Sequence, residues 1–186
     1  MQQIIVSGVG GQGVLFITKL LAETALDMGY SALISETHGM AQRGGNVISH
    51  LKISKRAGEG RESTFVSPLI RPGRADVLLS LHPDAILAHG FYLKQGGEAF
   101  CNTSEGAKGS PELAACMSVF DAARIAEEIG SPISANLVLL GFAAGSGKLF
   151  CAPDQLQSTL ERFGGKRLGI SLKAFEAGLA ASCPGS

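Results

Sequence analysis

Near its amino end the chain reads Gln3-Ile4-Ile5-Val6-Ser7-Gly8-Val9-Gly10-Gly11-Gln12-Gly13-Val14-Leu15. A short, β-branched apolar run enters a glycine-rich turn, and the residues after the turn read as a helix. Within the turn, Gly8, Gly10 and Gly13 have the G-x-G-x-x-G spacing. Between a strand and a helix this spacing predicts a tight turn, a close approach of backbone to ligand, and close packing of helix on strand.

The glycine turn also predicts an anion site. A helix that begins near Gln12 points its unpaired N–H groups and the positive end of its dipole at the turn, which favours a bound phosphate. A turn that only packs the first strand–helix unit is the structural alternative. The predicted cofactor-binding residues are Gly8, Gly10, Gly11, Gln12, Gly13 and Glu36.

The residues after the turn predict a strand–helix–strand unit. Apolar residues recur at helical spacing from Val14 to Met28, and Gly29 predicts the end of that helix. Residues 30–35 read as a second strand that ends at Glu36, and such units build parallel sheets. Dinucleotide-binding folds place a ribose-binding acid at this strand end, and Glu36 matches that position loosely.

The segment from Glu36 to Asn46 follows a strand's carboxyl end, where open α/β sheets bind ligands. It combines polar side chains with glycines that a ligand or partner can approach closely. The guanidinium of Arg43 suits a carboxylate or a phosphate, but a surface ion pair also accounts for an arginine here. The predicted substrate or partner contacts are His38, Gln42, Arg43, Gly44, Gly45 and Asn46.

The rest of the chain alternates apolar runs with helical patterns, which predicts an α/β class protein. We expect a Rossmann-like three-layer fold in one domain, residues 1–186, with a mostly parallel sheet and a small antiparallel excursion. The excursion comprises a strand at 47–53 and a returning strand at 64–67. Further strands are expected at 75–81, 97–102 and 116–120, and helices at 83–93, 122–129, 134–145, 153–163 and 168–181.

The composition argues against several classes of protein. Sixteen basic residues balance sixteen acidic ones, which gives no reason to expect nucleic acid or an anionic membrane as a partner. No apolar run approaches the roughly 20 residues of a spanning helix, and no secretory signal is evident, so we expect a cytoplasmic location. Hydrophobic residues make up 45% of the chain, which predicts a large core or an apolar surface for a partner.

The chain offers no set of side chains for metal binding or catalysis. Its four cysteines are scattered, without a C-x-x-C pair or a histidine at ligand spacing. We therefore expect no metal site and no iron–sulfur cluster in this chain. Neither a Ser/His/Asp or Cys/His set nor a pair of carboxylates can be assembled, so no catalytic residue is predicted.

Two segments together resemble one enzyme family. Residues 7–14 and 35–47 are similar to the gamma subunit, or gamma domain, of the 2-oxoacid:ferredoxin oxidoreductases. The form Gly39-Met40-Ala41-Gln42-Arg43-Gly44-Gly45 most resembles the beta subunit of indolepyruvate ferredoxin oxidoreductase. The similarity continues through residues 67–70, 75–79, 136–141 and 172–178, and therefore spans nearly the whole chain.

The resemblance implies a subunit of an enzyme that oxidatively decarboxylates a 2-oxoacid to an acyl-CoA and reduces ferredoxin. It places thiamine diphosphate, magnesium and 4Fe-4S clusters in partner subunits, and makes CoA a co-substrate. The isolated chain is then inactive, and a homodimer of it is a further expectation. One departure is His82-Pro83, where relatives of the indolepyruvate type often have Glu before the proline.

Two other functions fit the residues without the resemblance. The first is a free-standing NAD(P)- or FAD-binding oxidoreductase domain that uses Gly8, Gly10, Gly13 and Glu36. The second is a CoA- or nucleotide-binding regulatory module.

Overall fold

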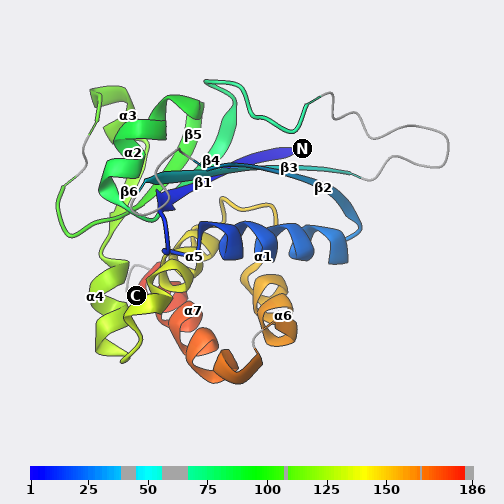
Figure 1. Cartoon of the computed structure of the whole chain (residues 1–186), viewed down its shortest axis with the longest axis vertical. Coiled ribbons are helices and arrows are strands. Elements are labelled where there is room, and N and C mark those ends of the chain that lie inside the picture. The colour runs from blue at the N-terminus through cyan, green and yellow to red at the C-terminus, as the bar shows by residue number, and fades with distance from the viewer. Residues whose placement is uncertain (39–44, 56–66, 107–108, 164, 183–186) are drawn as a thin grey trace.

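The computed structural model describes residues 1–38, 45–55, 67–106, 109–163 and 165–182 (Figure 1). The predicted returning strand at 64–67 falls almost entirely outside these residues. The first strand, β1, joins a sheet of six strands in the order β2-β3-β1-β4-β5-β6. The strands are β1 (Gln2–Val9), β2 (Tyr30–His38), β3 (Asn46–Lys55), β4 (Ala75–Ser80), β5 (Leu93–Asn102) and β6 (Met117–Phe120).

β3 is the antiparallel member of this sheet. It runs antiparallel to β1 and to β2, whereas β1, β4, β5 and β6 pair in parallel. The predicted α/β, Rossmann-like fold with a mostly parallel sheet and a small antiparallel excursion is therefore confirmed.

The apolar run that precedes the glycine turn explains why β1 lies inside the sheet. Ile4, Ile5 and Val6 are each 0% exposed, as expected for a strand that is covered on both faces. β1 pairs with β3 from Gln2↔Ile53 to Val9↔Asn46 and with β4 over Ile4–Ser7. The glycine turn therefore leaves the sheet away from its two outer edges.

β3 also separates the two strands of the first strand–helix–strand unit. The unit forms, but β2 pairs with β3 and not with β1. β2 continues past Glu36, the expected strand end, because β3 supplies pairing partners for Thr37 and His38. The helix of the unit begins at Val14, later than the predicted start near Gln12, because Gly13 has the left-handed backbone conformation.

Helices cover both faces of the sheet and complete three layers (Figure 1). On one face lie α2 (Pro83–His89) and α3 (Pro111–Ala115). On the other lie α1 (Val14–Asp27), α4 (Ala122–Glu128), α5 (Ala135–Gly145), α6 (Pro153–Phe163) and α7 (Leu168–Ser182). The larger hydrophobic core lies on this second face, and a smaller one lies under α2.

Some element boundaries differ from the prediction. The helix expected at 83–93 ends at His89 and is followed by the 3-10 helix η1 (Gly90–Tyr92). A second 3-10 helix, η2 (Pro132–Ser134), precedes α5. α3 lies between the predicted strands at 97–102 and 116–120, where no helix is expected. It is short, and its first turn is stabilised because Ser110 Oγ accepts from Leu113 N at 3.3 Å and Pro111 begins that turn.

Within the described part of the chain, no helix combines the length and the apolar character needed to cross a membrane.

α5 and α7 approach each other closely. An ideal Cβ on Gly141 of α5 would lie 2.0 Å from the Phe175 carbonyl oxygen, and one on Gly178 of α7 would lie 1.9 Å from the Val138 carbonyl oxygen. These contacts are with backbone atoms, which cannot rotate away as a side chain can. Glycine is therefore needed on both sides of this crossing, and α5 is buried as its apolar sequence predicts.

Gly178→Ala tests this packing. We expect a loss of about 1–3 kcal/mol or more in the free energy of unfolding, since the methyl group forces two backbones apart. The matched control is Gly169→Ala in the same helix, where a Cβ meets nothing within 4 Å. The control should be neutral or gain up to about 1 kcal/mol from helix propensity. Denaturant unfolding midpoints measure both, and equal midpoints for the two variants would refute the close crossing.

Candidate functional site

The glycine turn is held by the side chain of Gln12. Its Oε1 accepts from Val9 N at 2.7 Å, and its Nε2 donates to the Leu81 carbonyl at 3.3 Å. The Gln12 backbone N–H donates to the Val9 carbonyl at 3.1 Å, which closes the turn. Gln12 thus occupies the space between the carboxyl ends of β1 and β4, where open α/β sheets usually bind ligands.

The Leu81 carbonyl also joins a third strand to this arrangement. Asn102, the last residue of β5, donates from Nδ2 to the same carbonyl at 3.2 Å. Asn102 Oδ1 in turn accepts from Ala123 N at 3.1 Å, in the first turn of α4. Side-chain amides therefore connect the carboxyl ends of β1, β4 and β5.

Gly13 is fixed by a contact from α5. Its φ of 81° is in the left-handed region, which favours glycine. Asn136 Nδ2 donates to the Gln12 carbonyl at 3.0 Å, and a Cβ on Gly13 would lie only 2.2 Å from that nitrogen. The neighbour of Gly13 is thus α5 and not β1, so the expected helix-on-strand contact at this glycine is wrong.

The second predicted segment meets the glycine turn at its start. Gly10 N donates to the Gly45 carbonyl at 3.2 Å, and Asn46 pairs with Val9. His38 ends β2 at the same edge, opposite Val47. The structure thus brings Gly45, Asn46 and the backbone of His38 to the glycine turn. Gln42, Arg43 and Gly44 lie outside the described residues.

Glu36 does not join the other predicted cofactor-binding residues. It is exposed, and it pairs with Ser49 of β3, which lies between β2 and β1. In dinucleotide-binding folds the glycine turn and the ribose-binding acid act on one ligand at the strand crevice. With β3 inserted, the geometry gives no support to a free-standing NAD(P)- or FAD-binding domain.

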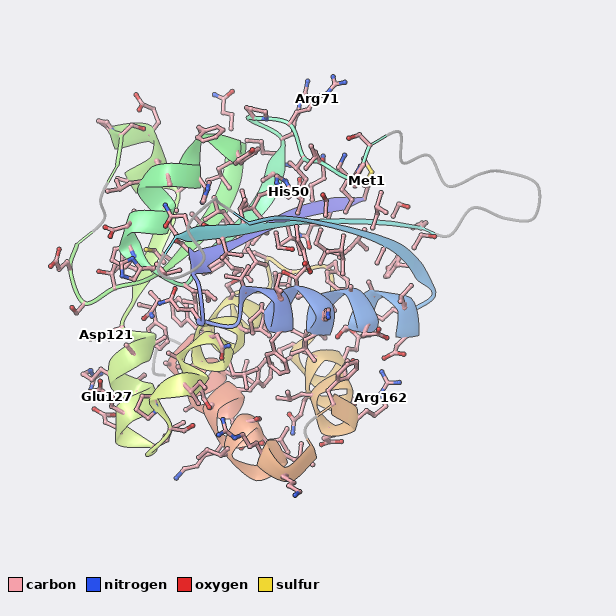
Figure 2. All side chains as sticks on the ribbon, in the orientation of Figure 1. Met1, His50, Arg71, Asp121, Glu127 and Arg162 are labelled. Atoms are coloured by element: carbon pink, nitrogen blue, oxygen red, sulfur yellow. The ribbon has the colours of Figure 1, made fainter. Side chains whose placement is uncertain are left out.

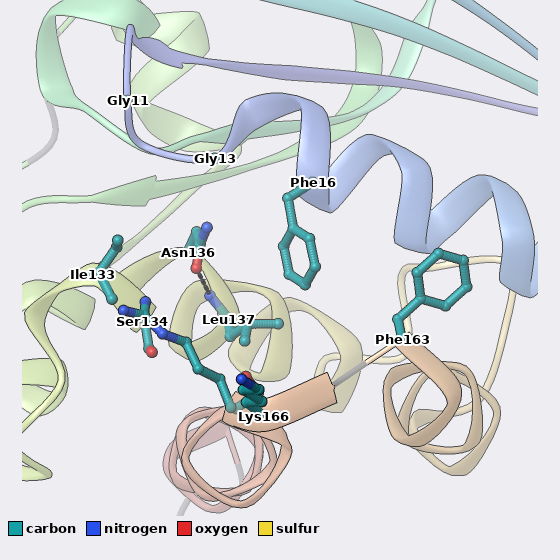
Figure 3. A pocket seen from close by; sticks show the side chains of 11 residues that line it. Gly11, Gly13, Phe16, Ile133, Ser134, Asn136, Leu137, Phe163 and Lys166 are labelled. Carbon is teal, nitrogen blue, oxygen red and sulfur yellow. Dashed lines mark hydrogen bonds between the residues drawn. The ribbon is translucent and has the colours of Figure 1, made fainter.

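Two cavities flank the glycine turn. One, of about 370 Å³, lies below it (Figure 3). A second, of about 420 Å³, lies between the turn, the start of α1 and Val47. Gly11, Gly13 and Phe16 line both. The remaining residues around the first cavity are Ile133, Ser134, Asn136, Leu137, Phe163, Lys166, Arg167 and Ser171.

Most of these lining residues carry no signal in the sequence. Phe16 and Phe163 fall within predicted helices and Ile133 lies just before one, yet they are 37%, 46% and 64% exposed, respectively. Lys166 and Arg167 form the 3-10 helix η3 (Gly165–Arg167), outside the predicted helices. Only the three-dimensional packing of α1, α5 and α6 shows that these residues share one cavity.

Two histidines lie in the layer between the sheet and α2. Burial lowers the pKa of His50 to about 4, so it is neutral at neutral pH, and its Nδ1 accepts from Ile70 N at 3.3 Å (Figure 2). Burial also lowers the pKa of His89, whose Nδ1 lies 2.7 Å from Ser7 Oγ. Because Ser7 is 0% exposed, this pair is closed to a substrate and acts in packing.

Two of the three described cysteines are unsuited to holding a cluster. Cys101 and Cys151 are buried, and burial raises the pKa of Cys101 to about 11 and that of Cys151 to about 12. A cluster ligand is a thiolate, which these values disfavour. Among the residues with a described position, no three His, Cys, Asp or Glu side chains gather as a metal site.

Comparison with known proteins now places the chain. Residues 3–181 match the family described as pyruvate ferredoxin/flavodoxin oxidoreductase. The chain belongs to this family. It is 30% identical over 199 residues to the indolepyruvate oxidoreductase subunit IorB of Thermococcus kodakarensis, covering 96% of this chain and 95% of the relative. The corresponding subunit of Archaeoglobus fulgidus is 31% identical over 194 residues, covering 94% of this chain and 92% of that one.

Solved structures show the same fold. The gamma subunit of a keto/oxoacid ferredoxin oxidoreductase from Geobacter sulfurreducens superposes with a TM-score of 0.77 at 24% identity, covering 98% of both chains. A pyruvate oxidoreductase subunit from Thermotoga maritima has a TM-score of 0.71 at 20% identity, covering 96% of this chain and 95% of that one. The prediction of a subunit of a 2-oxoacid:ferredoxin oxidoreductase is confirmed at the level of the family.

Gly13→Ala tests the contact that fixes the glycine turn. The variant combines left-handed strain with displacement of Asn136, so we expect a loss of about 2–4 kcal/mol in unfolding free energy. Gly29→Ala, at the other end of α1, is the matched control, because its φ of 77° brings the same strain while a Cβ there meets nothing within 4 Å.

The Gly29→Ala control should lose only about 1–2 kcal/mol of the free energy of unfolding. In an Asn136→Ala background the additional cost of Gly13→Ala should fall to that of Gly29→Ala, which a double-mutant cycle of unfolding midpoints measures. A Gly13→Ala cost that does not depend on Asn136 would show that the contact does not fix the turn.

Proposed function

We propose that this chain is the cofactor-free subunit of an indolepyruvate-type 2-oxoacid:ferredoxin oxidoreductase. In this proposal the glycine turn and residues 36–46 form one surface toward the partner subunits and CoA. The hydrogen bond from Gly10 N to the Gly45 carbonyl carries the proposal, because it joins the two segments that are most characteristic of the family. Family membership and the indolepyruvate relatives support the reaction.

Partner subunits supply the redox chemistry in this proposal. The buried, protonated Cys101 and Cys151 do not fit an iron–sulfur cluster, which supports placing the 4Fe-4S clusters in another chain. Thiamine diphosphate with magnesium, also in a partner, supplies the decarboxylation chemistry when bound. Ferredoxin then meets the complex through the cluster-bearing subunit. This chain's own residues position the partner and the acyl acceptor.

CoA is a fitting ligand for the glycine turn. The amino end of α1 has no side-chain cap, and a Cβ on Gly11 would meet nothing within 4 Å, so the backbone there is open to an anion. A 2-oxoglutarate:ferredoxin oxidoreductase from Magnetococcus marinus was solved with 2-oxoglutarate, coenzyme A and succinyl-CoA bound. This chain covers 31% of that larger chain, with 20% identity and a TM-score of 0.76.

Three further expectations accompany the proposal. The match over residues 3–181 supports one functional domain across residues 1–186. A cytoplasmic location stays a prediction from the sequence, as does a homodimer of the isolated chain. The free amino end of α1 also suits a nucleotide-binding regulatory module. A variant of this chain whose complex loses 2-oxoacid oxidation while the chain keeps nucleotide binding would separate that function from the proposed one.

Arg43→Ala tests the proposed surface. Removal of a guanidinium from a desolvated contact costs about 2–5 kcal/mol of binding free energy. We therefore expect normal folding but a large loss of indolepyruvate-dependent ferredoxin reduction by the assembled complex. Arg43→Lys should restore little, because a point charge does not reproduce the planar fork. The measurements are the activity of the complex and a thermal melt of the free subunit.

Arg71→Ala is the control for this experiment. Arg71 is exposed on the α2 side of the sheet (Figure 2), and its removal brings the same loss of charge. The control should keep full activity. An Arg43→Ala complex that is as active as the control would remove Arg43 from the functional surface.

A further inference from the structure

The cavity below the glycine turn combines an apolar wall with positive charge. Phe16 of α1, Ile133 of η2 and Phe163 of α6 are among the few large hydrophobic side chains of the described residues that are more than a third exposed. All three line this one cavity (Figure 3). Exposed apolar side chains that gather from three separate elements indicate a binding site and not a scattered surface.

The charged side of the cavity comes from η3. Lys166 and Arg167 are exposed and line the cavity, and neither forms an ion pair with another described residue. Figure 3 shows Lys166 on the side of the cavity opposite the glycine turn. Two neighbouring cations without acidic partners favour an anionic group, and the guanidinium of Arg167 matches a carboxylate in particular.

The polar groups of the cavity are few. Besides the two cations, side-chain polar atoms come from Ser134, Asn136 and Ser171. Asn136 is already engaged with Gln12 and Leu137, and Ser134 Oγ lies 2.8 Å from Ser131 Oγ. This inventory suits a ligand with one anionic group on an apolar body better than a ligand with several phosphates. A volume of about 370 Å³ is within the range of small-molecule sites.

We propose that this cavity binds an aromatic carboxylate, with its ring against Phe16, Ile133 and Phe163 and its carboxylate on Lys166 and Arg167. The inference rests on the proposed function in one respect, since the aryl 2-oxoacid of that reaction and the acid derived from its product belong to this ligand class. The cavity shares Gly11 and Gly13 with the surface assigned to partner subunits and CoA, whereas its aromatic and basic residues lie outside residues 8–13 and 36–46.

The experiment uses the isolated full chain and indole-3-acetate. Because the chain has no tryptophan and only two tyrosines, the fluorescence of the indole ring reports its transfer into the cavity directly. We expect saturable binding. Acetate, which lacks the ring, and indole, which lacks the carboxylate, should each bind at least about tenfold more weakly, as expected when a charged hydrogen bond or the apolar contact is lost.

Matched variants assign the binding to this cavity. The pair Lys166→Gln and Arg167→Gln should each weaken indole-3-acetate binding by about tenfold, whereas Lys173→Gln, an exposed lysine of α7 outside the cavity, should not. Ile133→Ala should weaken it as well, and Leu87→Ala, which shortens an equally exposed side chain on α2, should not. Thermal melts of all variants confirm that each is folded.

Three results would overturn the proposal. The first is an absence of saturable binding, and the second is equal binding by the cavity variants and their controls. The third is tighter, competing binding of adenosine 3′,5′-bisphosphate, which would assign the cavity to a nucleotide. Ferredoxin reduction by the assembled complex is measured separately with indolepyruvate. If the cavity does not bind indole-3-acetate, the proposed reaction can still be tested by this assay. If the complex does not oxidise indolepyruvate, the binding measurements on the isolated chain still stand.

Discussion

The side-chain amide of Gln12 holds together two segments that are distant in sequence. It accepts from Val9 N and donates to the Leu81 carbonyl, and so connects the turn after β1 with the end of β4. The amides of Asn102 and Asn136 extend the same arrangement to β5 and α5. A hydrocarbon side chain in place of Gln12 would leave polar backbone groups without these partners, at a cost of about 1–3 kcal/mol for each group that is buried. The shape of the glycine turn therefore depends on amide hydrogen bonds within the protein.

The antiparallel strand β3 decides what kind of site this edge of the sheet offers. It moves β2, and with it Glu36, away from β1, and it brings Gly45 to the glycine turn instead. On this side of β1, a turn with dinucleotide-type glycine spacing thereby meets Gly45 and Asn46 at the start of β3 and not the end of a neighbouring parallel strand. The glycine pattern here therefore occurs without the ribose-binding acid beside it that a dinucleotide site uses.

Much of the architecture could be predicted from the sequence because it depends on local patterns. The apolar run Ile4–Val6, the helical spacing after Val14 and the alternation from Val47 define their elements without any long-range information. The position of β3 between β1 and β2 could not be predicted, because strand pairing is decided by distant segments. The same holds for the site. The glycines are visible in the sequence, but the contact of Asn136 with Gly13 and the gathering of Phe16 and Lys166 around one cavity arise only when α1, α5 and η3 pack together.

The central claim is that residues 8–13 and 36–46 form one surface for the partner subunits. Amide hydrogen exchange of this chain, alone and assembled with its partner subunits, tests it most directly, because exchange reports protection segment by segment. The account predicts slower exchange in both segments on assembly, with little change around Leu87 on the outer side of α2. Slower exchange confined to α2 and α3, with both segments unchanged, would contradict it.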